Sequence, residues 1–247
     1  MLNNIMDTTT MIHTLIYTTT AISTYYLSLQ SQSSLTPILF GWSIYGFTTV
    51  AHDLLHKPTK RNKMISFLCM DALIINSDYW IQYHNKYHHT DLDGDNDIMK
   101  LKGNTLLEEW YNLLEICKEG TLTEHIYRLP FYCVLYQLRW YQIIEIYMTI
   151  FFCLAYFTYI THSHPVKNNY KKNSIEHNLC HTIDIFPESK FINLLFGGIN
   201  CHATHHCFPT CPRSKLYTKS RYLALMYPKH YRSIHTFKQL VNLYKDR

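Results

Sequence analysis

Ten of the 16 histidines fall into four short clusters, and this pattern restricts the chain more than any other feature. The clusters are His52-x3-His56, His84-x3-His88-His89, His177-x3-His181 and His202-x2-His205-His206. Residues three or four apart share one face of a helix, so each cluster can direct two or three imidazoles at a common centre. One such pair is often no more than two surface histidines. Four in one chain indicate metal binding, because imidazole is a common protein ligand for iron, zinc and copper.

The number of clustered histidines indicates more than one metal ion. Eight to ten imidazoles exceed the ligands that one ion can hold, which for zinc is about four. We therefore expect two metal ions. His162 and His164 are two apart and would point away from each other on a helix, so we expect an interfacial role for both. The isolated residues are expected to be structural or to lie at the surface, and they are His13, His125, His230 and His235.

Apolar runs separate the histidine clusters. Residues 11–29 and 35–51 are uncharged and flank a short polar stretch, which predicts a transmembrane hairpin. Four basic residues follow between Lys57 and Lys63, which places that end of the hairpin in the cytoplasm by the positive-inside rule. Residues 126–160 are apolar and aromatic but are interrupted near Arg139. They predict two short spans, and one long span is also compatible with them.

These runs predict an all-α, polytopic membrane protein with about four transmembrane helices in two hairpins. A cytosolic helical cap would hold the di-metal site. We expect one domain over residues 1–247, and its parts are the first hairpin (1–51), the first two clusters (52–125), the second transmembrane region (126–161) and a cytosolic part (162–247). Within the second part, residues 64–80 predict an interfacial or capping helix and 101–123 a surface helix.

Composition leaves one alternative to the membrane architecture and excludes one class of partner. The mean hydropathy of −0.17 is low for a polytopic membrane protein, so a soluble helical protein remains open. The clusters nevertheless all lie outside the apolar runs. Residues 212–247 contain nine Lys or Arg and one acid, Asp246, yet they carry no nucleic-acid motif. A basic segment at a cytoplasmic membrane face fits them better. Eight cysteines without a C-x2-C pair fit free thiols better than a zinc knuckle.

The clusters and their flanks resemble the membrane fatty acid desaturases, a family of integral membrane di-iron enzymes defined by three histidine boxes. The first two boxes are His52–His56 and His84–His89. The third lies in the segment Gly197–Arg213, which reads G-G-x-N-x4-HH-x-F-P-T-x-P-R. The similarity runs from about Gly41 to Leu225. The flanks of the third box look like those of front-end desaturases, which usually have Gln where this chain has His202.

The resemblance implies a ligand set and a set of supporting residues. The implied metal ligands are His52, His56, His84, His88, His89, His181, His202, His205 and His206. His177 is similar to a residue that reaches the metal directly or through water. Polar neighbours that could orient the ligands are Asp53, Asn178, Asn200 and Asp184. The acidic stretch Asp91–Asp97 lacks the glycine and glutamate positions of a calcium loop, and we expect it to be a solvated loop.

The resemblance also implies an activity and its cofactors. It predicts an O2-dependent desaturase with two iron ions that introduces a double bond into the acyl chain of a lipid or thioester. Electrons would come from an external donor, cytochrome b5 or ferredoxin, and the boxes would face the cytosol, at the endoplasmic reticulum in a eukaryote. A lipid, carotenoid or alkane hydroxylase or ketolase of the same superfamily is the closest alternative. A membrane metal transporter or sensor is another, although transporters place their ligands within spans.

Overall fold

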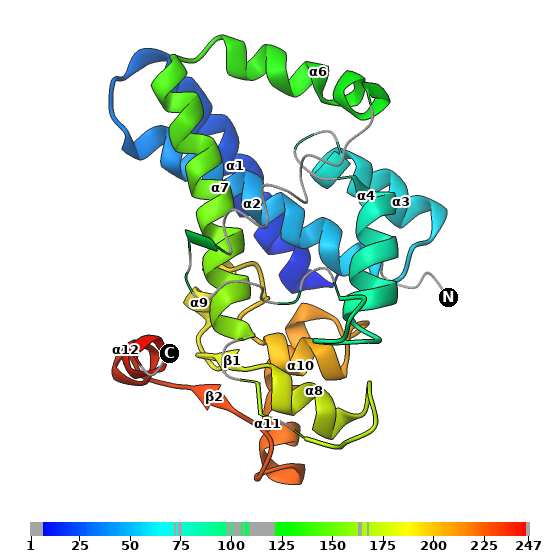
Figure 1. The fold of residues 1–247 in the computed structure, drawn as a ribbon. Coiled ribbons are helices and arrows are strands. Elements are labelled where there is room, and N and C mark those ends of the chain that lie inside the picture. The colour runs from blue at the N-terminus through cyan, green and yellow to red at the C-terminus, as the bar shows by residue number, and fades with distance from the viewer. Residues whose placement is uncertain are drawn as a thin grey trace.

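Three long helices packed side by side form one half of the molecule (Figure 1). They are α1 (Thr8–Gln30), α2 (Leu35–Leu55) and α7 (Trp140–Thr161), and α2 contacts both of the others. The structure is a computed structural model that describes residues 7–71, 73, 76–97, 100, 105, 107–108, 122–162, 165–166 and 168–245. Most of the surface helix expected over residues 101–123 lies outside the described residues, as does His164.

Local sequence signals set the ends of these helices. Asp7 precedes α1, and its side chain accepts a hydrogen bond of 2.7 Å from the backbone N–H of Thr10. The break expected near Arg139 is confirmed, because α6 (Leu122–Tyr136) ends before it and α7 begins after it. There the Gln142 Oε1 atom accepts a 3.0 Å hydrogen bond from the Arg139 backbone N–H. Gln142 also donates to the carbonyl of Ser28 over 2.9 Å, so the same residue ties α7 to α1.

The apolar core lies between the long helices and extends to α6 and η1 (Phe67–Asp71). Burial of these side chains holds α1, α2 and α7 together at roughly 1.5–3 kcal/mol for each large residue. The buried members are Ala21, Phe40, Ile44, Ala51, Leu55, Met70, Phe131, Leu135, Leu138, Ile146 and Ile150.

Short elements build the other half of the molecule, which we call the cap. After α2 come α3 (Lys60–Ser66), η1, α4 (Ser77–Trp80) and the π-helical η2 (Ile81–His88), so the single helix expected over residues 64–80 is divided into shorter pieces. After α7 come α8 (Ile175–His181), α9 (Lys190–Leu195), α10 (His202–Cys207), α11 (Arg213–Met226) and α12 (Phe237–Lys245). The strands β1 (Asp184–Ile185) and β2 (Ser233–Ile234) pair in parallel.

One helix of the described chain, α7, is both long and apolar enough to cross a membrane. It has 22 residues and a mean hydropathy of 1.8. Four of its apolar side chains, spaced four residues apart, are about half exposed or more and form one stripe; they are Trp140, Ile144, Met148 and Phe152. The helical architecture with a histidine-bearing cap is therefore confirmed, whereas the arrangement of four spans remains a prediction.

We expect the protein to stay in the membrane pellet after alkaline carbonate extraction. The apolar stripe of α7 would be costly to expose to water, and α1 adds exposed apolar residues such as Met11 and Leu15. Immunoblotting of pellet and supernatant measures the partition, with a peripheral membrane protein as the control that must be released. Recovery of most of the protein in the supernatant would contradict a membrane span.

Candidate metal centre

Nine buried or half-buried histidines form two adjacent groups in the cap. In each group the candidate ligand nitrogens all lie within 4.8 Å of one another. The five-histidine group consists of His52, His56, His84, His89 and His205, and the four-histidine group consists of His88, His162, His202 and His206. The rings of His89 and His206 stack across the two groups with centroids 4.4 Å apart. The arrangement therefore offers two neighbouring cation sites made of imidazole.

The spacing of the nitrogens fits metal ions at both positions. The Nε2 atom of His84 lies 2.9 Å from that of His52 and 3.1 Å from that of His89. In the other group, Nε2 of His202 lies 2.8 Å from His162 and 3.1 Å from His206. Neighbouring ligands of one ion with metal–nitrogen distances of about 2.1 Å are themselves about 3.0 to 3.4 Å apart. The residues present thus fit two imidazole-bound ions.

The first box contributes through the end of α2. His52 lies in the last turn of the helix and His56 is its C-terminal capping residue, so the two rings meet with centroids 4.8 Å apart. His52 Nε2 is also 3.4 Å from His56 Nε2. Both residues therefore belong to the same group, as the i,i+4 spacing predicts.

The second box is divided between the two groups by the π-helical winding of η2. His89 donates its backbone N–H to the carbonyl of His84 over 3.0 Å, a hydrogen bond that spans five residues. In an α-helix, residues five apart diverge by about 140° around the axis. The wider π-helix turns less per residue, and it brings His84 and His89 to the same group while His88 reaches the other. A π-helical segment is an uncommon structure that is frequent at functional sites.

The third box is divided in the same way by α10. His202 and His206, four residues apart, join the four-histidine group, and His205 joins the five-histidine group. The chain enters α10 through Gly197 and Gly198, whose φ angles are +61° and +83°. A Cβ atom on Gly197 would lie 2.0 Å from Oγ1 of Thr49 on α2. The glycine pair therefore allows this turn to lie directly against the helix that carries the first box.

Burial favours the neutral form, which metal binding requires, for seven of the nine histidines. Burial, and after it the neighbouring imidazoles, lowers the pKa well below the ordinary value for six of them, namely His56, His84, His89, His202, His205 and His206. Burial also lowers the pKa of His162 to about 3. Nε2 of His205 is buried without a hydrogen-bond partner. A metal cation would accept the lone pair of this nitrogen.

Two carboxylates hydrogen-bond to Nδ1 of candidate ligands and so fix the orientation of these histidine rings. Asp53 accepts from Nδ1 of His52 over 3.0 Å, and both oxygens of Asp97 lie 3.0 Å from Nδ1 of His88. Because a carboxylate accepts this proton, Nε2 of each ring keeps its lone pair for a metal. Burial raises the pKa of Asp97, but the hydrogen bonds from His88 and the backbone of Asp93, together with the electrostatic effect of nearby histidines, outweigh burial and keep that pKa below the ordinary value. Asp97 is 3% exposed, so the expectation of a solvated loop is wrong at this position.

Other predicted site residues contact the backbone of the cap. Asn178 donates to the carbonyl of His206 over 3.0 Å. Asp184 accepts from the backbone N–H of Thr204 over 3.1 Å and so caps the first turn of α10. Asn200 donates to the carbonyl of Ile185 over 3.1 Å and holds the turn before α10 to β1. All three residues are buried, and they support the third box through its backbone.

His177 and His181 lie outside both groups. Their rings stack 4.5 Å apart on α8, and Nδ1 of His181 lies 2.5 Å from a carboxylate oxygen of Asp93. Nε2 of His181 lies 3.1 Å from the side-chain amide of Asn168. The structure therefore does not bring His181 to the other eight predicted ligands, and its place is taken by His162.

Sequence reasoning missed His162 and Asp97. His162 follows the last residue of α7 and is 3% exposed, which is not an interfacial position. The signal available was its place at the exit of a long apolar run, on the side where the other clusters lie. For Asp97 the signal was the repeated D-x-D pattern close after the second box.

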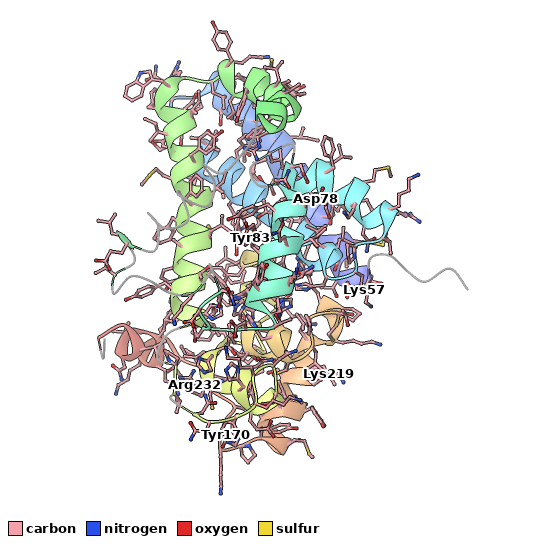
Figure 2. All side chains as sticks on the ribbon, turned by 45° about the vertical axis from the view of Figure 1, so that its right-hand side comes forward. Lys57, Asp78, Tyr83, Tyr170, Lys219 and Arg232 are labelled. Carbon is pink, nitrogen blue, oxygen red and sulfur yellow. The ribbon has the colours of Figure 1, made fainter. Side chains whose placement is uncertain are left out.

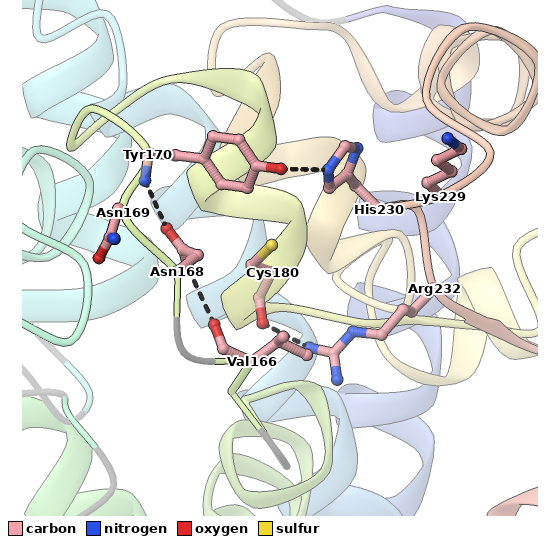
Figure 3. Close-up of a pocket in the computed structure, with 8 residues that line it drawn as sticks. All are labelled: Val166, Asn168, Asn169, Tyr170, Cys180, Lys229, His230 and Arg232. Carbon is pink, nitrogen blue, oxygen red and sulfur yellow. Dashed lines mark hydrogen bonds between the residues drawn. The ribbon is translucent and has the colours of Figure 1, made fainter.

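A further pocket of about 510 Å³ lies in the cap but contains none of the nine histidines (Figure 3). Tyr170 and His230 form a 2.8 Å hydrogen bond in it, which agrees with a structural role for His230. Arg232 donates to the carbonyl of Cys180 over 2.9 Å and joins the segment before β2 to α8. Figure 2 places Arg232 and Lys219 in the same half of the molecule, away from α6. The pocket is thus lined by basic residues of the cap and is separate from the two histidine groups.

We expect Asp97→Asn to weaken metal binding at the four-histidine group by about 10- to 100-fold, the usual effect of losing a carboxylate behind a ligand. The amide removes the negative charge that stabilises His88. Metal content per chain after dialysis against a graded chelator series measures the loss. Asp95→Asn is the matched control, since Asp95 is exposed in the same loop. Equal metal retention in the two variants would show that Asp97 does not support a ligand.

The sequence was also compared with known protein families and with curated proteins. A profile of the family described as fatty acid desaturase matches residues 125–238, and no curated protein matches the chain. The matched segment includes α7, the third box and His162, and the structure brings the first two boxes to them. The family predicted from the histidine boxes is therefore confirmed over residues 125–238, which match the fatty acid desaturase profile.

Proposed function

We propose that the protein is an O2-dependent fatty acyl desaturase with a di-iron centre at the two histidine groups. The observation that carries the proposal is the pair of adjacent, buried, all-imidazole groups in a chain whose residues 125–238 match the desaturase family. Imidazole suits iron, zinc, copper and nickel, so the ligands alone do not select iron. The reaction selects it, because breaking an unactivated C–H bond with O2 needs a redox-active metal. When bound, a pair of irons would pass electrons from an external donor to O2 and so supply the oxidising power for that step.

The residues of the chain hold and shield this centre. In the proposed assignment the five-histidine group holds one ion and the four-histidine group holds the other, with His162 in place of His181. Asp53 and Asp97 keep the protons of His52 and His88 on Nδ1. Trp80 stacks on His84 with centroids 4.4 Å apart and covers one face of that ligand. Burial of the rings excludes water that would compete for the metal or quench a reactive oxidant.

The substrate and donor complete the proposal. A long acyl chain, carried by a lipid or a thioester, is the substrate class that fits an apolar span ending beside the metal centre. His162 directly follows α7, so the end of the candidate span and a proposed ligand are adjacent in sequence. The two electrons would come from an external carrier of the cytochrome b5 or ferredoxin type. The cap would face the cytosol, in a eukaryote at the endoplasmic reticulum.

Expression in yeast tests the reaction. We expect the fatty acid profile to gain an unsaturated species whose double bond is absent from cells with the empty vector. His205→Ala should abolish that species, whereas His230→Ala should keep it, since His230 bonds to Tyr170 outside both groups. A hydroxylated product would replace the desaturase with a hydroxylase of the same superfamily. No product together with labile zinc would instead indicate metal transport or sensing.

We expect His162→Ala to lose about half of the iron per chain together with activity, because it opens one of four positions in the four-histidine group. His181→Ala should keep both ions, since His181 contacts Asp93 and Asn168 and neither group. Iron analysis of the purified variants and the fatty acid profile measure the two effects. Full iron in His162→Ala beside iron loss in His181→Ala would restore His181 as the ligand.

A further inference from the structure

The last helix, α12, has an apolar face that its neighbours cover only in part. Successive residues of a helix are 100° apart, and at this interval the apolar residues of α12 occupy one arc of about 160°. Those residues are Phe237, Leu240, Val241 and Leu243. The opposite arc carries Lys238, Gln239 and Asn242. The helix is therefore amphipathic along its whole length.

One side of the apolar arc is packed on the protein. Leu240 and Leu243 contact a buried cluster that includes Tyr159 and Ile160 at the end of α7. Phe237 and Val241, on the other side of the arc, are 72% and 49% exposed. An exposed phenylalanine and valine one turn apart form a continuous apolar edge. The ring of Phe237 contacts that of Phe186 with centroids 5.2 Å apart, and most of this edge is still accessible to another molecule.

The start of α12 is fixed and not frayed. Thr236 Oγ1 accepts from the backbone N–H of Gln239 over 3.2 Å, and Gln239 Oε1 accepts from that of Thr236 over 3.0 Å. These reciprocal bonds form a capping box. Just before it, β2 pairs with β1, and Phe186 donates to the carbonyl of Ile234 over 2.7 Å. The apolar edge is thus held in a defined orientation.

The helix lies at the level where the candidate span ends. Tyr159 and Ile160 belong to the cluster that α12 packs against, and they are among the last residues of α7, the helix apolar enough to cross a membrane. Figure 1 shows α12 (red) beside the lower part of α7 and seen nearly end-on, so its axis runs at a steep angle to that of α7. A helix in this position would run along the surface of a bilayer that α7 crosses.

Charge distinguishes between the possible partners. Residues 212–247 contain nine Lys or Arg and one acid, so the surroundings of α12 favour an anionic partner. The nearby carboxylate of Glu188 already pairs with His235 at 3.0 Å. An acidic carrier protein would require charged contacts, whereas this edge offers Phe237 and Val241 beside Lys238. Apolar insertion next to a lysine whose stem extends to the headgroups is typical of a bilayer surface.

We propose that α12 is a membrane-surface helix, with Phe237 and Val241 among the acyl chains and Lys238 at anionic lipid headgroups. The proposal goes beyond the oxidative reaction and does not depend on it. α12 is joined through its apolar cluster to the end of α7 that precedes His162. Binding of α12 to the bilayer surface would therefore set the distance between the cap and the membrane.

Tryptophan quenching by brominated lipid tests the proposal in the full-length protein. The protein would be reconstituted into vesicles of phosphatidylcholine and phosphatidylserine whose acyl chains carry bromine. Phe237→Trp and Val241→Trp are compared with Asn242→Trp, which places the probe on the polar arc of the same helix. All three are made in a Trp140→Phe background, because Trp140 is 74% exposed on α7. The emission added by each new tryptophan is obtained by subtracting the background protein.

We expect the emission added at 237 and 241 to be quenched at least twofold more than that at 242, and Lys238→Glu to reduce the difference when phosphatidylserine is present. Equal quenching at the three positions would overturn the proposal. Blue-shifted but unquenched emission at 237 and 241 would overturn it as well, because a protein surface would then cover the edge. Trp140 in the parent protein reports separately whether α7 itself lies in lipid.

Discussion

The cap depends on one constraint, which is that nine imidazoles must lie close together away from water with their nitrogens facing each other. A neutral imidazole has one N–H and one lone pair, so two Nε2 atoms 2.8 to 3.1 Å apart can share at most one proton. Protonating the rings does not relieve this conflict, since burial and neighbouring histidines oppose positive charge. A bound cation satisfies several lone pairs at once. Metal binding and the fold of the cap are therefore coupled, as in other sites whose ligands converge only in the folded chain.

An ion pair between buried Arg213 and half-buried Asp53 fixes how the first and third boxes meet. Nε of Arg213 lies 2.5 Å from Asp53, and Asp53 also accepts from His52. Arg213 further contacts Thr49 and His13, so one guanidinium joins α11 to α2 and α1. Such a pair adds little net stability, because the fully buried guanidinium loses its hydration. Removing Asp53, however, would leave that buried charge without its carboxylate. The pair therefore specifies the register of the third box against the first, more than it stabilises the fold.

The sequence predicts the parts of this site better than their assembly. The i,i+3 and i,i+4 spacings identified eight of the nine clustered histidines, and Arg139 marked the break before α7. Spacing failed for His162, because its partners His88, His202 and His206 come from distant segments and no local pattern links them to it. It also misled for His177 and His181, which share a helical face but direct it at Asp93. Local periodicity shows which residues share a face, whereas tertiary packing decides what that face meets.

The second and third boxes each contribute histidines to both groups, so the site needs both halves of the chain. The segment matched to the family begins at residue 125 and contains three members of the four-histidine group but only His205 of the other. The remaining members come from α2, η2 and the residues that cap their C-terminal ends, all of which precede it. Because η2 sends His84 and His89 to one group and His88 to the other, it belongs to both sites at once. A small rotation of η2 would therefore disturb the two groups together, and the winding of this one element determines the spacing between them.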